Sequence, residues 1–137
     1  MVDEATWYFA FTEGERNTFW SKWCKRGFSH CAVFASVGHN IVSVEPTTTG
    51  ISIRNHFDPN DPGRTVHPDE LISEWKKLGW RVVRHTFGQG APRKLLSISN
   101  CWPSCVTVCK ITSGYSPWCF TPWQYYKALI KDGAEEL

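Results

Sequence analysis

Six short stretches rich in aromatic and β-branched residues constrain the fold more than any other feature of the sequence. Glycine, proline or asparagine lies near the ends of most of them, which is typical of strands joined by turns. They cover residues 6–12, 28–37, 41–45, 50–54, 80–87 and 95–98. Gly38-His-Asn40 lies between the second and third stretches and predicts a hairpin. We therefore predict a small antiparallel sheet.

Other segments carry helical signals, and the sheet and helices together predict an α+β fold with helices packed on the sheet. The predicted helices cover residues 16–25, ended by Gly27; a segment capped by Asp69 and ended by Gly79; a segment starting at Ser104 or Cys105; and a last one entered through Thr121-Pro-Trp-Gln124. Tyr125, Tyr126, Leu129 and Ile130 form the apolar face of the last helix. Residues 55–68 are predicted to be loop, and residues 132–137 to fray.

The length and composition fit one globular domain over residues 1–137. Hydrophobic residues make up 42% and charged residues 20%, a balance that argues against disorder. The formal net charge of +2 is too small to indicate a polyanionic partner, and no glycine-rich phosphate loop is present. We therefore expect neither nucleic acid nor nucleotide as a partner.

The first residues, Met-Val-Asp-Glu-Ala, lack the basic and apolar regions of a signal peptide. No apolar run approaches 18 residues, so no membrane span is expected. Without a secretory signal, the six cysteines indicate thiols rather than a disulfide framework. The expected location is the cytoplasm of a host cell or a virus particle.

Cys105 is the best candidate for a reactive group. It lies at the expected start of a helix, after a Pro-containing turn and with Ser104 as a plausible N-cap. Unpaired N–H groups and the helix dipole favour a thiolate there. The alternative is a small buried apolar residue, as Cys24, Cys31, Cys109 and Cys119 are expected to be.

His30 has the best setting for a base among the five histidines, because a strand gives its ring a fixed direction. The alternative is a hydrogen-bonded structural histidine. His39 lies in a turn, His56 and His67 lie in the long loop, and His85 lies on a strand far from any obvious partner.

Glu45 is the candidate that would orient the imidazole. With a two-residue loop at Gly38-His39, Val37 pairs with Asn40 and Glu45 falls opposite Ala32. Glu45 is then a diagonal neighbour of His30, about 7–8 Å away between Cα atoms. A slip of one residue would turn it to the other face. An exposed strand carboxylate is the alternative, with Asn40, Thr47 and Asn100 as substitutes.

These pieces resemble the circularly permuted papain-like group, which contains the permuted NlpC/P60-type cysteine hydrolases and the lecithin-retinol-acyltransferase-like proteins. The matching segments also look like small uncharacterised proteins of phages and proteobacteria. They are Gly27-Phe-Ser-His-Cys-Ala-Val-Phe34, Val44-Glu-Pro46, Pro103-Ser-Cys-Val-Thr-Val-Cys-Lys110 and Thr121-Pro-Trp-Gln-Tyr-Tyr126.

The resemblance implies a permuted papain-like architecture and a thiol hydrolase or acyltransferase that cleaves an amide or ester bond. Cys105 would be the nucleophile, His30 the base and Glu45 the orienting residue. Peptidoglycan peptides, proteins and acyl esters are all compatible substrates, and no cofactor is implied. Cys101 is an alternative nucleophile. Trp7, Trp102, Trp118 and Trp123 would either line the substrate site or fill the core.

Two other interpretations remain open. Cys101, Cys105 and Cys109 with His30 offer metal ligands, but the C-x3-C-x3-C spacing lacks the close pair usual in zinc sites, so no metal is expected. The same fold could also serve as a non-enzymatic phage virion protein or a protein that binds a host partner.

Overall fold

The computed structural model describes residues 6–13, 24–37, 40–47, 50–58, 61–86 and 105–137. Six strands form the main sheet: β1 (Thr6–Thr12), β2 (His30–Val37), β3 (Asn40–Thr47), β4 (Gly50–Asn55), β7 (Arg81–Thr86) and β8 (Glu135–Glu136). The helices are α1 (Pro68–Lys77), α2 (Cys105–Ser113) and α3 (Pro122–Lys131). A separate two-stranded sheet pairs β5 (Phe57–Asp58) with β6 (Asp61–Thr65).

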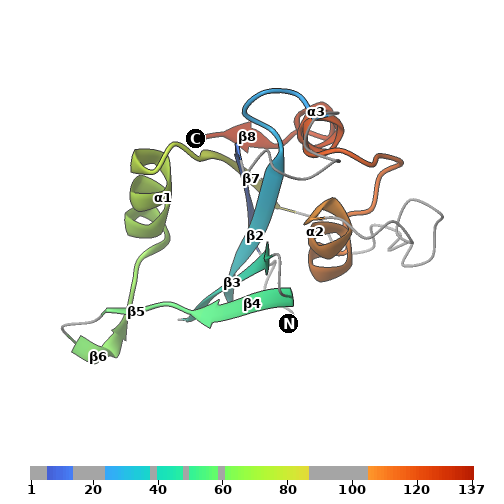
Figure 1. The fold of residues 1–137 in the computed structure, drawn as a ribbon. Helices are drawn as coiled ribbons and strands as arrows, with labels where there is room; N and C mark the ends of the chain where they lie inside the picture. Colours follow the sequence, from blue (N-terminus) through green and yellow to red (C-terminus); the bar gives the residue numbers. More distant parts are fainter. Residues whose placement is uncertain (1–5, 14–23, 38–39, 48–49, 59–60, 87–104) are drawn as a thin grey trace.

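The main sheet has the strand order β4-β3-β2-β1-β7-β8, and every neighbouring pair is antiparallel. Helix α1 covers one face of this sheet, whereas α2 and α3 lie on the other face (Figure 1). The α+β class predicted from the sequence is confirmed, with a sheet of six strands.

Alternation along the central strands divides the core into two layers. Phe9 and Phe11 of β1 face α2 and α3, whereas Tyr8 and Ala10 face α1. All four are at most 7% exposed. Burial of one large apolar side chain contributes about 1.5–3 kcal/mol, so the two layers hold the helices on both faces of the sheet.

The start of α3 confirms the predicted capping box. The Thr121 hydroxyl accepts a hydrogen bond from the Gln124 N–H, and the Gln124 side chain accepts one from the Thr121 N–H. Pro122 occupies the first helical position, where its missing N–H costs nothing. The predicted strand at 6–12 is confirmed with its bounds, and those at 28–37, 41–45, 50–54 and 80–87 are confirmed with bounds shifted by one or two residues.

The prediction of loop throughout residues 55–68 was wrong, because β5 and β6 form a short antiparallel pair there. Proline and glycine normally interrupt strands, and they argued for loop in this segment. A two-stranded sheet has only edge strands, which tolerate a residue without an N–H.

Two terminal predictions were also wrong. The N-cap of α1 is His67, not Asp69, because Pro68 is suited to the first helical position and the His67 Nδ1 accepts from the Asp69 N–H at 3.2 Å. The acidic tail does not fray throughout, since β8 pairs with β7 and the Leu137 N–H donates to the Val82 carbonyl.

Ile130 was predicted on the buried face of α3 but is 39% exposed, while Tyr125 and Leu129 are fully buried. The predicted helical residues 16–23, the turn at 88–92 and the strand at 95–98 lie outside the described residues. So do Ser104, Asn100, Cys101 and Trp102. Within the described ranges, no helix is long and apolar enough to cross a membrane.

Candidate active site

The first residue of β2 is His30, and packing with α3 fixes where this strand begins. Phe28 is 5% exposed, and its ring lies 4.7 Å from that of Trp123 and 5.0 Å from that of Tyr126. The Ser29 N–H then donates to the Thr12 carbonyl at 3.1 Å, which aligns His30 with Thr12 of β1. His30 therefore projects from the end of a strand that is anchored on both sides.

Cys105 is the first residue of α2. Val106 and Cys109 are 1% and 0% exposed and belong to the core layer between the sheet and the helices. This packing directs the start of α2 toward the sheet while Cys105 stays only partly buried. A thiol in this position meets the N–H groups of the first helical turn, which favour negative charge.

The ladder between β2 and β3 runs from Val37–Asn40 to Val33–Val44 in the described residues, and it stops before His30 and Glu45. The Val37–Asn40 pair is the register predicted from a two-residue loop. Past the end of this ladder, the Cys105 thiol lies close enough to His30 and Cys31 for both residues to lower its pKa. Neighbouring side chains on a strand point to opposite faces, so the end of the ladder is where one sulfur can meet both.

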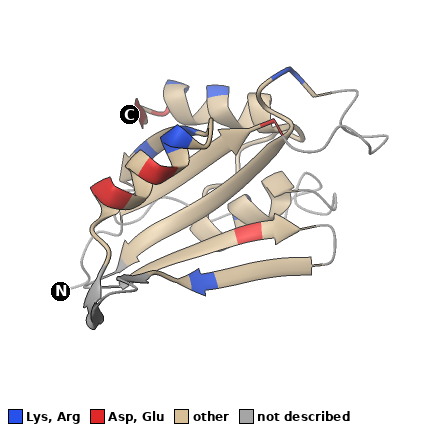
Figure 2. Ribbon diagram, turned by 60° about the vertical axis from the view of Figure 1, so that its left-hand side comes forward, with Lys and Arg blue, Asp and Glu red and all other residues tan. Residues whose placement is uncertain are grey.

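Glu45 approaches His30 from β3. Its Oε1 lies 3.4 Å from the His30 Nε2, and the side chains are 37% and 22% exposed, respectively. In Figure 2, the ribbon of β3 carries a red, acidic segment, and Glu45 is the acidic residue in the sequence of that strand. At 3.4 Å the contact is a long one for a hydrogen bond. It occupies Nε2 and leaves Nδ1 as the ring nitrogen that can exchange a proton with a thiol.

The three side chains predicted from the sequence thus lie together, and the thiol and imidazole perturb each other. Burial pulls the pKa of His30 down, but its contacts with Cys105 and then Glu45 outweigh burial and raise the pKa above the usual value. The pKa of Cys105 is held well below that of an ordinary thiol, first by the hydrogen bond from Cys31 and also by His30, against the opposing effect of burial. Both shifts favour a thiolate–imidazolium pair.

Two neighbours of this group were missed. Trp80 lies against His30, with ring centroids 5.7 Å apart, and packs in turn on Trp75 at 4.8 Å. Cys31 was expected to be only structural, yet its thiol contacts Cys105. Alternation along β2 signals that Cys31 is buried, but only the position of α2 shows which side chain it meets.

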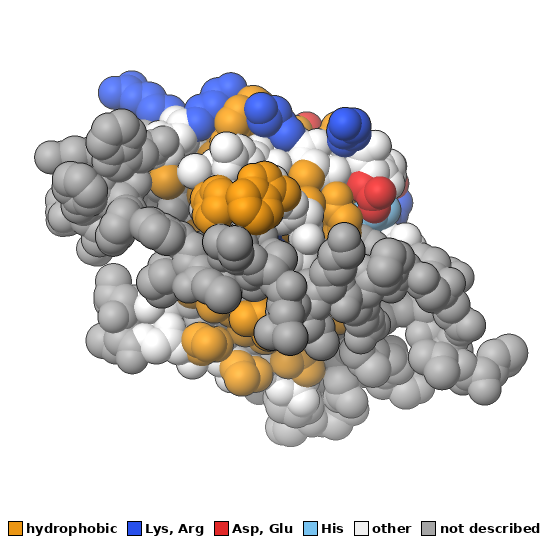
Figure 3. Space-filling view, turned by 90° about the vertical axis from the view of Figure 1, so that its right-hand side faces the viewer, with side chains coloured by type: hydrophobic (Ala, Val, Ile, Leu, Met, Phe, Trp, Pro, Cys, Tyr) orange, Lys and Arg blue, Asp and Glu red, His pale blue; other side chains and the backbone are white. Residues whose placement is uncertain are grey.

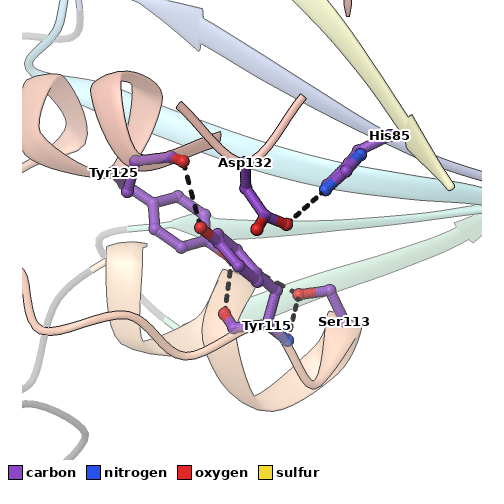
Figure 4. A network of polar contacts seen from close by, with 6 residues as sticks. His85, Ser113, Tyr115, Tyr125 and Asp132 are labelled. Atoms are coloured by element: carbon purple, nitrogen blue, oxygen red, sulfur yellow. Dashed lines mark hydrogen bonds and ion pairs between the residues drawn. The ribbon is translucent and has the colours of Figure 1, made fainter. Parts of the chain in front are cut away.

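A second histidine–carboxylate pair involves His85, for which the sequence predicted no partner. Its Nε2 is 2.7 Å from Oδ2 of Asp132 (Figure 4). Nearby, the Tyr125 hydroxyl donates to the Tyr115 carbonyl at 2.8 Å and lies 3.3 Å from the Ser113 Oγ. This network joins the end of α2 to α3 and β7, so its geometry accounts for a structural role.

The remaining histidines also have placements. His56 Nε2 lies 2.7 Å from the Ser43 Oγ, His67 caps α1, and His39 is outside the described residues. No group of three or more His, Cys, Asp or Glu side chains in the described part of the chain is arranged to hold a metal ion. Cys101, one of the proposed metal ligands and the alternative nucleophile, falls outside that part.

The surface over α2 and α3 carries exposed apolar side chains with cations along one border (Figure 3). Trp118 is 69% exposed, Ile111 is 55% exposed, and Trp7 and Trp123 are partly buried against the core. Two shallow hollows lie beside α1 and the β7–β8 edge. Lys76 and Leu137 line both of them, and Trp80, which packs on His30, lines one.

Comparison with known proteins adds no further constraint: no protein family, no curated protein and no solved structure matches this chain. The geometry of the described residues therefore carries the functional argument.

Proposed function

We propose that this protein is a thiol hydrolase or acyltransferase that cleaves an amide or ester bond through Cys105, His30 and Glu45. The single observation that supports this most is the grouping of the three side chains: the Cys105 thiol and the His30 ring shift each other's pKa toward the charged forms, and the Glu45 Oε1 lies 3.4 Å from the His30 Nε2. A nucleophile, a base and an orienting group in this order are the parts that covalent acyl transfer requires.

In the proposed reaction, the Cys105 thiolate attacks the carbonyl carbon of the substrate. The backbone N–H of Cys105, at the start of α2, would help stabilise the oxyanion. The His30 imidazolium gives its proton to the leaving amine or alcohol, and the acyl group remains on sulfur as a thioester. His30 then takes a proton from water, which attacks the thioester and releases the acid; an acyltransferase would use a second nucleophile instead.

We infer a circularly permuted papain-like architecture for the same reasons. The base precedes the orienting carboxylate on adjacent strands, and the nucleophile opens a later helix that packs on them. Peptidoglycan stem peptides and protein amides are the proposed substrates, with other acyl esters also compatible. The proposed setting is the cytoplasm of a host cell or a virus particle.

A non-enzymatic role in a virion or in binding a host protein is the second proposal, and one observation favours it. Ile51 and Ile53 on the edge strand β4 are 58% and 69% exposed. Alternate residues of a strand share one face, so they form an apolar edge that a partner chain could cover.

Site-resolved alkylation separates these proposals. The full chain is treated with limiting iodoacetamide between pH 5 and pH 9, and each cysteine is quantified by mass spectrometry. The hydrolase proposal predicts that Cys105 reacts first, well below pH 8, and that His30→Ala removes this preference. Hydrolysis of a p-nitrophenyl ester should fall in Cys105→Ala to the rate without protein.

His85→Ala is the matched control, because His85 also pairs with a carboxylate, but with that of Asp132 rather than that of Glu45. This variant should leave the reactivity of Cys105 unchanged. Equal and slow alkylation of several cysteines, together with unchanged ester hydrolysis in Cys105→Ala, would reject the enzyme and favour the binding protein.

A further inference from the structure

We propose that Cys31 is a positioning residue for the nucleophile: its buried thiol donates an S–H hydrogen bond to the Cys105 sulfur and holds that sulfur beside His30. This inference rests on the proposed function and deepens it. It assigns to Cys31 a task different from those of the base and the orienting carboxylate, which act on the imidazole.

Three sulfur atoms lie in succession where α2 packs on β2. Cys31 is 0% exposed and pairs with Phe11 of β1, so its backbone position is fixed by the sheet. Cys109, one helical turn after Cys105, donates to the Cys31 sulfur over an Sγ–Sγ distance of 3.6 Å. The Cys31 side chain is also the neighbour that lowers the pKa of Cys105 most. Cys31 therefore lies between two sulfurs that the same helix presents to it.

The charge on Cys105 sets the direction of the proton. A thiol has one proton to donate, and Cys31 lies between the sulfurs of Cys109 and Cys105. The Cys105 thiolate has no proton and can only accept, so the proton of Cys31 is directed to it. A thiol is a weak donor to a neutral group but a stronger one to an anion. Burial, followed by the hydrogen bonds to Cys105 and Cys109, raises the pKa of Cys31 well above the usual value, so the donor keeps its proton.

This arrangement would fix the Cys105 side chain as well as its charge. A sulfur at the first position of a helix can rotate about its Cα–Cβ bond toward solvent. A donor from the core side and His30 on the other side favour the one orientation that faces both. The described ionisable groups that face Cys105 are Cys31 and His30 of β2, while Glu45 of β3 acts through His30 and Cys109 acts through Cys31.

The test measures the alkylation rate of Cys105 against pH in the full chain, which reports the apparent pKa of Cys105 without any substrate. Cys31→Ala should raise that pKa and lower the rate at pH 6 about tenfold, the change that a shift of one pKa unit produces. Cys31→Ser keeps a donor and should restore most of the rate. Cys119→Ala, at another buried thiol, should leave the rate unchanged.

Cys31→Val is the second variant, since it fills the space of the thiol without a donor and remains informative if the alanine variant fails to fold. An unchanged Cys105 pKa in the folded non-donor variants would overturn the role of Cys31. If His30→Ala still raised that pKa, the proposed function would stand. An ordinary thiol pKa for Cys105 in the unaltered protein would remove both proposals.

Discussion

The pairing register of β2 with β3 decides the role of Glu45. A shift of one residue would turn this carboxylate away from His30 and leave it exposed on the strand. The two-residue connection between β2 and β3 predicts the Val37–Asn40 pair, and the structure has that pair. Glu45 then reaches His30 because both side chains lie past the last β2–β3 pair. A carboxylate here compensates a positive ring and fixes its orientation, which a neutral amide does less well.

Glu45→Gln should lower the pKa of His30, because the carboxylate is one of the groups that raise it. Removing a negatively charged neighbour destabilises the protonated ring, so the His30 ring loses its proton at a lower pH. NMR titration of the His30 ring measures the shift. We also expect ester hydrolysis at pH 7 to fall about tenfold, the change that a shift of one pKa unit in the base produces.

Asp132→Asn is the control for this change, since it removes the carboxylate of the other histidine pair. It should leave the His30 titration where it was. A His30 pKa that is equal in Glu45→Gln and in the unaltered protein would show that the 3.4 Å contact has no electrostatic effect.

At the scale of the element, α3 holds the start of β2 and closes the core layer over it. Its beginning depends on a local signal, the capping box of Thr121 and Gln124. Its burial depends on a contact with a distant part of the chain: the ring of Tyr125 lies 5.6 Å from that of Phe9 in β1, measured between centroids. A substitution that destabilises α3 should therefore shift Phe28, which packs on this helix, and with it His30 at the start of β2.

Thr121→Ala should lower the free energy of unfolding by about 1 kcal/mol, because it removes the acceptor for the Gln124 N–H. Urea unfolding followed by tryptophan fluorescence measures this loss. Thr121→Ser keeps the hydroxyl and should recover most of it. An equal loss in both variants would mean that the methyl group, not the cap, is responsible.

Tyr125→Phe should cost about 1–3 kcal/mol, since it removes a buried donor from the Tyr115 carbonyl. The side chain is fully buried, so water does not readily replace the lost hydrogen bond. Tyr126→Phe is the matched variant, because its hydroxyl donates to Glu136 in an exposed position, and its effect should be smaller. Similar losses in urea unfolding would contradict the role assigned to burial.

At the scale of the whole molecule, buried thiol and phenol groups lower the stability of the folded state at alkaline pH. Burial raises the pKa of Cys119 to about 11 and that of Tyr115 to about 12, above ordinary values of 9.0 and 10.0. Between those values the unfolded chain loses protons that the folded chain retains, so stability falls as pH rises. Burial of Lys110 lowers its pKa and acts in the opposite direction.

Single variants isolate these contributions. We expect the unfolding free energy of the protein to fall between pH 9 and pH 12, and Cys119→Ala to reduce the part of that fall between pH 9 and pH 11. Tyr115→Phe should reduce the part between pH 10 and pH 12. Urea unfolding at fixed ionic strength measures the slopes, and parallel slopes in all three proteins would contradict the assignment.

The sequence alone determined the features that depend on neighbouring residues. A run rich in aromatic residues between two threonines predicts β1, and Thr121-Pro-Trp-Gln124 predicts the start of α3, because both signals act within a few residues. The loop length also predicts the register of β2 with β3, and through it the approach of Glu45 to His30. Local patterns failed at β6 and β8, where pairing with another strand overrides proline, glycine and charge.

Only the tertiary structure decided which side chains surround the Cys105 sulfur. In the sequence, nothing distinguishes Cys31 from the other buried cysteines or Trp80 from the other aromatic residues. Their roles follow from the packing of α2 on β2, which brings Cys31 to Cys105, and from the pairing of β7 with β1, which brings Trp80 to His30. These contacts join segments more than 45 positions apart in the chain, and no periodicity within either segment encodes them. The physical reason is that helix packing against a sheet depends on the complementarity of whole surfaces, whereas hairpins and helix caps depend on a few adjacent residues.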